Sequence, residues 1–155
     1  MDCLQFVDAR IIFRIGCLPS IHISFSKGVF VMELKFYRCK HCGNIVVKLE
    51  DSGVPVSCCG EAMEQLQAGV SDGAHEKHVP VVEHKDGIVK VRVGSVEHPM
   101  MPAHYIQWIV LETESGCQMK HLKPGAKPEA EFVLSDNSKV LAVYEYCNLH
   151  GLWKA

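Results

Sequence analysis

The chain has 155 residues, 48% of them hydrophobic and 22% charged, with a net charge of -2, which is typical of a globular protein with a real core. Its basic residues are scattered, which excludes the basic footprint of a nucleic-acid-binding protein. No stretch of about 20 apolar residues occurs, so we expect no membrane-spanning helix and no membrane partner. The unusual counts are 8 cysteines and 9 histidines, which together favour metal sites.

Residues 1–31 differ in character from the rest of the chain. Their apolar patches are interrupted by charges and a proline, and they show neither a helical nor an alternating period. Asp2 and Asp8 occupy the region that is basic in a signal peptide, so a secretory leader is not indicated. We expect an N-terminal extension without a fold of its own, followed by a functional protein that begins at Met32.

The segment 32–68 is predicted to be a small metal-binding module. Cys39 and Cys42 stand in a C-x2-C-G turn between two short strand-like runs, and the pair Cys58-Cys59 follows. So short a segment buries too little apolar surface to be stable unaided, so a metal would supply the folding energy. Neighbouring cysteines rarely bond each other, which favours metal ligation in a reducing compartment over disulfides. Four thiolates select zinc or iron.

The adjacent pair Cys58-Cys59 places a demand on the backbone. Neighbouring residues of an extended chain point in opposite directions, so both sulfurs reach one ion only where the backbone bends sharply. Gly60 directly after the pair permits such a bend.

From residue 69 to residue 155 the pattern is that of strands. Lys85-Asp86-Gly87 predicts a hairpin between two such runs. Counting by twos from His104 predicts that Ile106, Trp108 and Val110 share its inward face. About seven short strands at regular spacing predict an antiparallel β-sandwich or barrel. The expected strands include residues 79–82, 88–93, 105–111, 118–122, 131–134 and 139–146.

This second domain also carries a set of possible metal ligands at its strand ends and loops. A single histidine in such a place is more often solvated, so only the whole set indicates a metal site. Structural zinc usually stops at four ligands, and five donors favour a metal with octahedral habit and one open position, iron above all. The candidate ligands are His78, His98, His104, Cys147 and His150.

Several motifs of both domains occur together in one known family. They are Tyr37-Arg38-Cys39-x2-Cys42-Gly43, Cys58-Cys59-Gly60, Glu76-Lys77-His78-Val79-Pro80-Val81, Gly94-Ser95-Val96 with His98-Pro99-Met100, His104-Tyr105-Ile106-Gln107-Trp108 and Cys147-Asn148-Leu149-His150-Gly151. In these motifs the chain from about Met32 to Ala155 resembles desulfoferrodoxin, the two-iron form of superoxide reductase.

The resemblance implies an all-β protein with two iron centres. A desulforedoxin-like domain would hold Fe(Cys)4 at Cys39, Cys42, Cys58 and Cys59. An immunoglobulin-like antiparallel β-sandwich would hold a square-pyramidal iron, with four equatorial histidines and one axial cysteine, at His78, His98, His104, His150 and Cys147.

The activity that the resemblance implies is one-electron reduction of superoxide to hydrogen peroxide, without production of oxygen. It makes Lys77 and Glu76 the further catalytic residues. Strict strand alternation would aim Lys77 away from His78, so we expect Lys77 to lie on an irregular loop. The family also suggests a rubredoxin-like electron donor, a homodimer and a cytoplasmic location. Two other hypotheses are an iron electron-transfer protein closed to substrate and a zinc-binding structural or interaction module.

Overall fold

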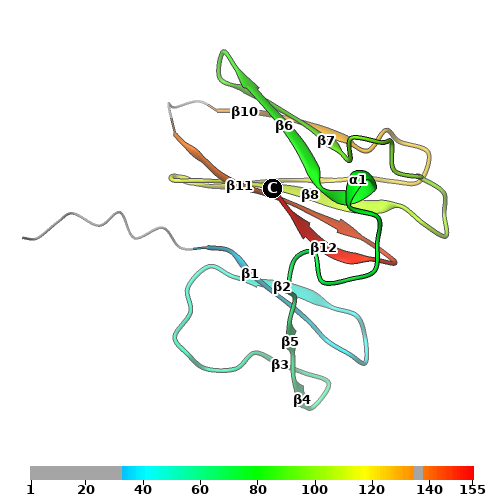
Figure 1. Cartoon of the computed structure of the whole chain (residues 1–155). Helices are drawn as coiled ribbons and strands as arrows, with labels where there is room; N and C mark the ends of the chain where they lie inside the picture. Colours follow the sequence, from blue (N-terminus) through cyan, green and yellow to red (C-terminus); the bar gives the residue numbers. More distant parts are fainter. Residues whose placement is uncertain (1–32, 135–137) are drawn as a thin grey trace, which may run out of the picture. The chain divides into compact units, whose positions relative to one another are not determined.

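The computed structural model describes residues 33–134 and 138–155, and its elements are almost all strands (Figure 1). The predicted extension at residues 1–31 lies outside the described residues. No helix in the described part of the chain has the length and apolar character needed to cross a membrane. The elements are β1 (Lys35–Arg38), β2 (Ile45–Lys48), β3 (Ser57–Cys58), β4 (Glu61–Ala62), β5 (Glu64–Gln65), α1 (His75–His78), β6 (Pro80–Lys85), β7 (Ile88–Val93), β8 (Ile106–Thr113), β9 (Gly116–His121), β10 (Glu129–Val133), β11 (Val140–Cys147) and β12 (Gly151–Lys154).

Strands β6 to β12 form the predicted β-sandwich. One sheet has the order β10-β7-β6 and the other β12-β11-β8-β9, with antiparallel pairing throughout. The predicted hairpin joins β6 to β7, and both its turn residues, Asp86 (φ 51°) and Gly87 (φ 74°), are left-handed as a two-residue hairpin turn requires. Apolar side chains of both sheets, such as Val91 and Leu111, form one core cluster between them. Strand β12 was not predicted.

Strand β8 contains an irregularity that changes which side chains face the core. In its pairing with β11, Tyr146 lies opposite Trp108 but Cys147 lies opposite Ile106, so Gln107 is an extra residue on β8. Ile106 therefore joins the core between the sheets, whereas Trp108 belongs to a second cluster. The prediction that Trp108 and Val110 share the face of Ile106 was wrong, because a bulge shifts the alternation by one residue.

The second cluster lies on the other face of the four-stranded sheet, where the cysteine-rich module packs. Phe36 of β1 stacks on Trp108 with ring centroids 5.3 Å apart and also contacts Tyr144 at 5.1 Å. The buried carboxylate of Glu112 accepts hydrogen bonds from the Leu34 backbone N–H (3.1 Å) and the Tyr144 hydroxyl (2.9 Å). Both faces of β8 are thus buried, which explains its nearly continuous apolar sequence.

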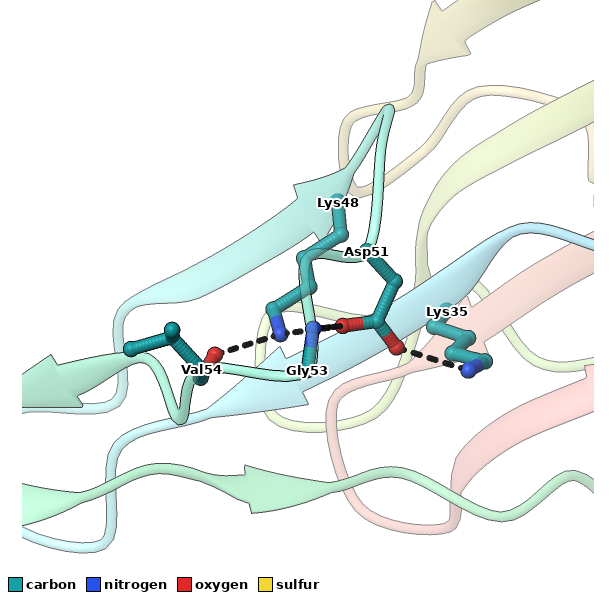
Figure 2. A network of polar contacts seen from close by, with 5 residues as sticks. All are labelled: Lys35, Lys48, Asp51, Gly53 and Val54. Atoms are coloured by element: carbon teal, nitrogen blue, oxygen red, sulfur yellow. Dashed lines mark hydrogen bonds and ion pairs between the residues drawn. The ribbon is translucent and has the colours of Figure 1, made fainter.

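A polar network closes the long loop of the module between β2 and β3 (Figure 2). Asp51 forms ion pairs of 2.8 Å with Lys35 of β1 and Lys48 of β2, and its carboxylate accepts the Gly53 backbone N–H at 3.0 Å. Lys48 also donates to the Val54 carbonyl at 2.7 Å. The two lysines hold the pKa of Asp51 well below its usual range. The loop that leads to Cys58 is therefore fixed to both strands.

Candidate metal centres

Four cysteine sulfurs converge at one end of the small module. The sulfurs of Cys39, Cys42, Cys58 and Cys59 all lie within 4.8 Å of one another. The Cys42–Cys58 and Cys58–Cys59 sulfur separations are 3.5 and 3.9 Å. In a tetrahedral site with metal–sulfur bonds of about 2.3 Å the sulfurs would be about 3.8 Å apart, so the group fits one ion of the zinc or iron type. All six described cysteines are free.

Two tight turns bring these sulfurs together. The first is closed by hydrogen bonds from the Gly43 N–H to the Cys39 carbonyl (3.1 Å) and from the Cys39 N–H to the Asn44 carbonyl (2.9 Å). In the second, Cys59 itself is left-handed (φ 51°), as is Gly60 (φ 83°). The sharp bend predicted at this pair is therefore present, and it begins one residue earlier than the glycine. A non-glycine residue held there is strained, and a metal bond to its sulfur offsets that cost.

Electrostatics within the four-thiol group favour a cation. Backbone N–H groups, first that of Cys42, lower the pKa of Cys39 to about 6. Hydrogen bonds among the sulfurs, first with Cys42, raise the pKa of Cys59 to about 12 and also raise that of Cys58. Without an ion Cys58 and Cys59 therefore stay protonated near pH 7, and a metal ion that binds their sulfurs displaces these protons.

The second donor group gathers at one end of the sandwich. His78 ends α1, His98 and His104 lie in the loop between β7 and β8, Cys147 ends β11 and His150 precedes β12. Their ligand atoms all lie within 4.8 Å of one another. His78, His98 and Cys147 are buried, whereas His104 and His150 are half-buried. The structure thus brings all five predicted donors together from three separate segments of the domain.

Hydrogen bonds fix which ring nitrogens of two histidines carry protons. The Nδ1 of His78 lies 2.8 Å from the Ala74 carbonyl, and the Nδ1 of His98 lies 2.6 Å from the Pro99 carbonyl. A carbonyl oxygen only accepts hydrogen bonds, so both Nδ1 atoms carry a proton and donate it. In the neutral rings both Nε2 atoms are therefore unprotonated. Yet these two Nε2 atoms face each other at 3.2 Å. Two lone pairs at that distance repel each other unless a cation binds both. A hydrogen bond from Nδ1 to a backbone carbonyl is also the usual way in which a metal-binding histidine is oriented.

Distances within the group also match metal ligation. The Nε2 of His78 lies 3.0 Å from the Nδ1 of His150, which in turn lies 3.6 Å from the Cys147 sulfur. Two nitrogens bound at about 2.1 Å are separated by about 3.0 Å at a right angle and by about 3.4 Å in a tetrahedron. The separations of 3.0 and 3.2 Å are thus nearer to ligands at right angles. The buried Nε2 of His104 has no hydrogen-bond partner among the described residues, and coordination to a metal ion would engage its lone pair.

Burial keeps the histidine donors in the neutral form that binds metals. It lowers the pKa of His98 to about 4 and lowers the pKa of His78 as well, so both rings are neutral near pH 7. Burial also lowers the pKa of His104, and the charges of His150 and Lys77 lower it further. The pKa of the Cys147 thiol is raised by burial, so its thiolate form depends on a bound cation.

Trp153 and Gly73 lie against two of these histidines, His78 and His150. The Trp153 ring stacks on His78 with centroids 4.7 Å apart, and its Nε1 donates to the His150 carbonyl at 3.2 Å. A Cβ at Gly73 would lie 2.9 Å from Trp153, 3.0 Å from His78 and 3.1 Å from His150. Only glycine fits this position without displacing a histidine.

Glu145 is a buried residue near the site that the sequence interpretation missed. It is fully buried, and neither carboxyl oxygen has a hydrogen-bond partner among the described residues. Burial raises the pKa of Glu145 to about 9, so the group is neutral at pH 7. Alternation along β11 places it on the face of Val143 and Cys147, and that pattern could have revealed it.

The two predicted catalytic residues lie on α1, a single helical turn rather than the irregular loop that we expected. Hydrogen bonds from the Lys77 N–H to the Ala74 carbonyl and from the Val79 N–H to the His75 carbonyl, both 3.0 Å, form the turn. Lys77 is half-buried and Glu76 is exposed. Lys77 lines a hollow of about 490 Å³ that His98 also lines.

A cysteine-rich module on an antiparallel β-sandwich that carries a four-histidine, one-cysteine donor group defines a non-haem metalloprotein with two centres. Comparison with known proteins specifies the family. The sequence model described as Desulfoferrodoxin matches residues 70–155, and that of the Desulfoferrodoxin N-terminal domain matches residues 32–66. The chain belongs to the desulfoferrodoxin family, as its motifs predicted.

Individual relatives agree with this assignment. Desulfoferrodoxin of Nitratidesulfovibrio vulgaris is 52% identical over 123 residues, which cover 79% of this chain and 96% of the relative. Desulfoferrodoxin of Desulfarculus baarsii is 48% identical over 123 residues, which also cover 79% of this chain and 96% of the relative. The crystal structure of the superoxide reductase from Treponema pallidum is similar with a TM-score of 0.68 at 42% identity, covering 80% of this chain and 99% of that one.

Proposed function

We propose that the protein is a superoxide reductase, which reduces superoxide by one electron to hydrogen peroxide at the five-donor group of the sandwich. The observation that carries this proposal is the convergence of four imidazoles and one thiol on one point, with two bare ring nitrogens facing each other. Family membership and the similarity to a superoxide reductase structure support it. The ligands would be His78, His98, His104, His150 and Cys147.

Iron held by His78, His98, His104, His150 and Cys147 would supply the single electron through its ferrous and ferric states, and the Cys147 thiolate would raise electron density at the metal. The reaction consumes one superoxide, one electron and two protons and yields one hydrogen peroxide. No oxygen is formed, in contrast to dismutation. A five-donor set suits this chemistry because it would leave an ion of octahedral habit one position for the anion.

Lys77 is assigned the binding of the anion. The whole chain has a net charge of -2, so attraction for superoxide must be local. The Lys77 charge acts on the group, because it helps to lower the pKa of His104. A half-buried lysine beside the donors supplies a positive charge where superoxide would enter.

Glu76 is assigned a part in proton supply. Its side chain is exposed beside Lys77, and its carbonyl accepts the Val96 N–H at 2.9 Å, which holds α1 against the following loop. An exposed carboxyl group exchanges protons with solvent and could pass them toward a reduced anion held near Lys77.

The module of residues 32–68 is proposed as a separate iron domain, with Cys39, Cys42, Cys58 and Cys59 as ligands, and residues 69–155 as the domain that carries the reaction. The two family matches, at 32–66 and 70–155, support this division. A complete shell of four sulfurs leaves no position for a substrate, so electron transfer is the role that suits this centre.

Partners and location follow from the same family. A rubredoxin-like protein is proposed as the electron donor, since each turnover consumes one electron. A homodimer is proposed as the assembly, which sedimentation analysis would measure. A reducing cytoplasm is proposed as the location, because ligation needs reduced cysteines and every described cysteine is free.

The test combines metal analysis, absorption and product stoichiometry. We expect two irons per chain and visible absorption from the ferric thiolate centres, whereas zinc sites are colourless. Reduced protein mixed with superoxide should yield about one hydrogen peroxide per superoxide and no oxygen. Iron that is present but does not react with superoxide would support the electron-transfer hypothesis, and a colourless zinc protein would support the structural one.

A further inference from the structure

The hollow beside the five-donor group has a second lysine in its wall. Its volume is about 490 Å³, and it is lined by Lys77, Glu97, His98, Pro99, Met100, Gly125, Ala126 and Lys127. Lys77 enters from α1, whereas Lys127 enters from the loop between β9 and β10. The two lysines therefore come from separate segments and line one space that His98 also lines.

Backbone hydrogen bonds hold Lys127 in this position. The Gly125 N–H donates to the Met100 carbonyl at 2.7 Å, which ties the loop to the segment after His98. On the other side of Lys127, the Pro128 carbonyl accepts the Val93 N–H of β7 at 2.9 Å. The loop is thus fixed on both sides of Lys127, and one attachment leads directly to a candidate ligand loop.

The charges of the hollow differ in sign from those of the whole chain. Two lysines line it against one carboxylate, Glu97, whereas the chain carries a net charge of -2. Neither Lys77 nor Lys127 forms an ion pair with any residue in the described ranges 33–134 and 138–155. The next acidic residue along the chain, Glu129, lines a different hollow together with Lys120. Both ammonium groups therefore remain free to attract an anion.

We propose that Lys127 is a second anion-steering residue, which acts with Lys77 to collect superoxide in this hollow beside the candidate iron site. The proposal rests on the proposed function for the identity of the anion, but not for the hollow itself. Lys127 would act on the encounter rate, because a surface charge changes the local concentration of an anion without touching the reacting atoms. Glu97 would oppose it.

The test measures the bimolecular rate between the reduced iron protein and pulse-generated superoxide at several ionic strengths. At low salt, Lys127→Met should slow the reaction roughly threefold, Lys127→Glu roughly tenfold, and Glu97→Gln should accelerate it roughly twofold. These differences should shrink at about 0.5 M salt, where the Debye length is only a few ångströms. Lys120→Met removes an equal charge outside the hollow and serves as the matched control. Unchanged absorption spectra would show that the iron centres are intact.

A second measurement does not depend on turnover. Azide is a small monoanion, and its affinity for the oxidised protein is measured from the change in absorption. Lys127→Met and Lys127→Glu should weaken azide binding by factors similar to their effects on rate. If both variants match Lys120→Met in rate and in azide affinity, the proposal is overturned. If azide affinity depends on Lys127 but the wild-type protein does not react with superoxide, the anion site stands and the proposed function fails.

Discussion

The two candidate metal centres are built in opposite ways. In the small module, Cys42 and Cys59 are exposed, and β3, which carries Cys58, is only two residues long. In the sandwich, His78, His98 and Cys147 are buried, and the site lies at one end of a core formed by two complete sheets. We therefore expect the first centre to depend on its ion for local structure, and the fold around the second centre to remain when its ion is removed.

The ligand sets differ in the same sense. Four sulfurs complete a tetrahedral shell, so the first ion would have no position for a substrate. Five donors would leave an ion of octahedral habit one position for a substrate, and the hollow that Lys77 lines is also lined by the donor His98. A closed and partly exposed centre suits electron transfer, whereas an open centre with mostly buried donors suits chemistry on a small anion.

Removal of metal should separate the two regions most strongly. With chelator, amide exchange in residues 39–62 should accelerate on the order of 100-fold or more, because few buried apolar contacts remain to hold that part. Exchange in β7, β8 and β11 should change little, since these strands form the sandwich core. Hydrogen exchange with mass spectrometry measures both regions in one sample. Equal loss of protection in both regions would contradict the claim that only the small module depends on its metal for structure.

A substitution at Gly73 should weaken the second centre alone. In Gly73→Ala the new Cβ meets Trp153, His78 and His150 at 2.9 to 3.1 Å, so the Trp153 ring must shift and both histidines must move by a few tenths of an ångström. Displacing what orients a ligand histidine typically costs roughly 10- to 100-fold in metal affinity. Competition with a chelator measures that affinity. The control Ala74→Ser adds one atom at the exposed neighbouring residue and should leave the metal affinity of the second centre unchanged. Neither substitution should change the metal affinity of the four-cysteine centre.

The smallest effect is expected at Asp51, in the module alone. The folded-state pKa of Asp51 lies below its unfolded value, so its stabilising effect is present above the unfolded pKa and is lost as pH falls through the folded one. Asp51→Asn should therefore lower the melting temperature of the module by a constant amount from neutral pH down to about 5, and by less below about 4. A difference that grew as the pH fell would contradict the ion pairs with Lys35 and Lys48.

The sequence predicts most of the fold because its signals are local. The hairpin turn at Asp86 and Gly87 follows from residues that tolerate left-handed backbone, and the structure has it there. The face of Trp108 was not predictable, because the bulge at Gln107 is visible only in the pairing with β11. Alternation without the bulge would place Trp108 in the wrong core.

The donor residues could be predicted because cysteine and histidine are chemically distinctive, whereas the residues that support them are not. Gly73 looks like a linker glycine in the sequence, and its contact with Trp153 joins segments about 80 residues apart. The helical turn at Lys77 depends on hydrogen bonds that no periodicity reveals in four residues. Glu145 follows the alternation of β11, but a carboxyl without a partner in a core contradicts the usual expectation for a glutamate.

The most direct test of the account asks whether the sandwich centre reduces superoxide without the other. Cys58→Ser removes one sulfur of the four-cysteine group, and Cys117→Ser is the matched control because Cys117 is free, exposed and belongs to neither donor group. With the sandwich iron reduced, Cys58→Ser should react with pulse-generated superoxide within about twofold of the wild-type rate, since no charge near Lys77 changes. A variant that kept the sandwich iron but lost superoxide reduction would contradict the assignment of the reaction to that centre.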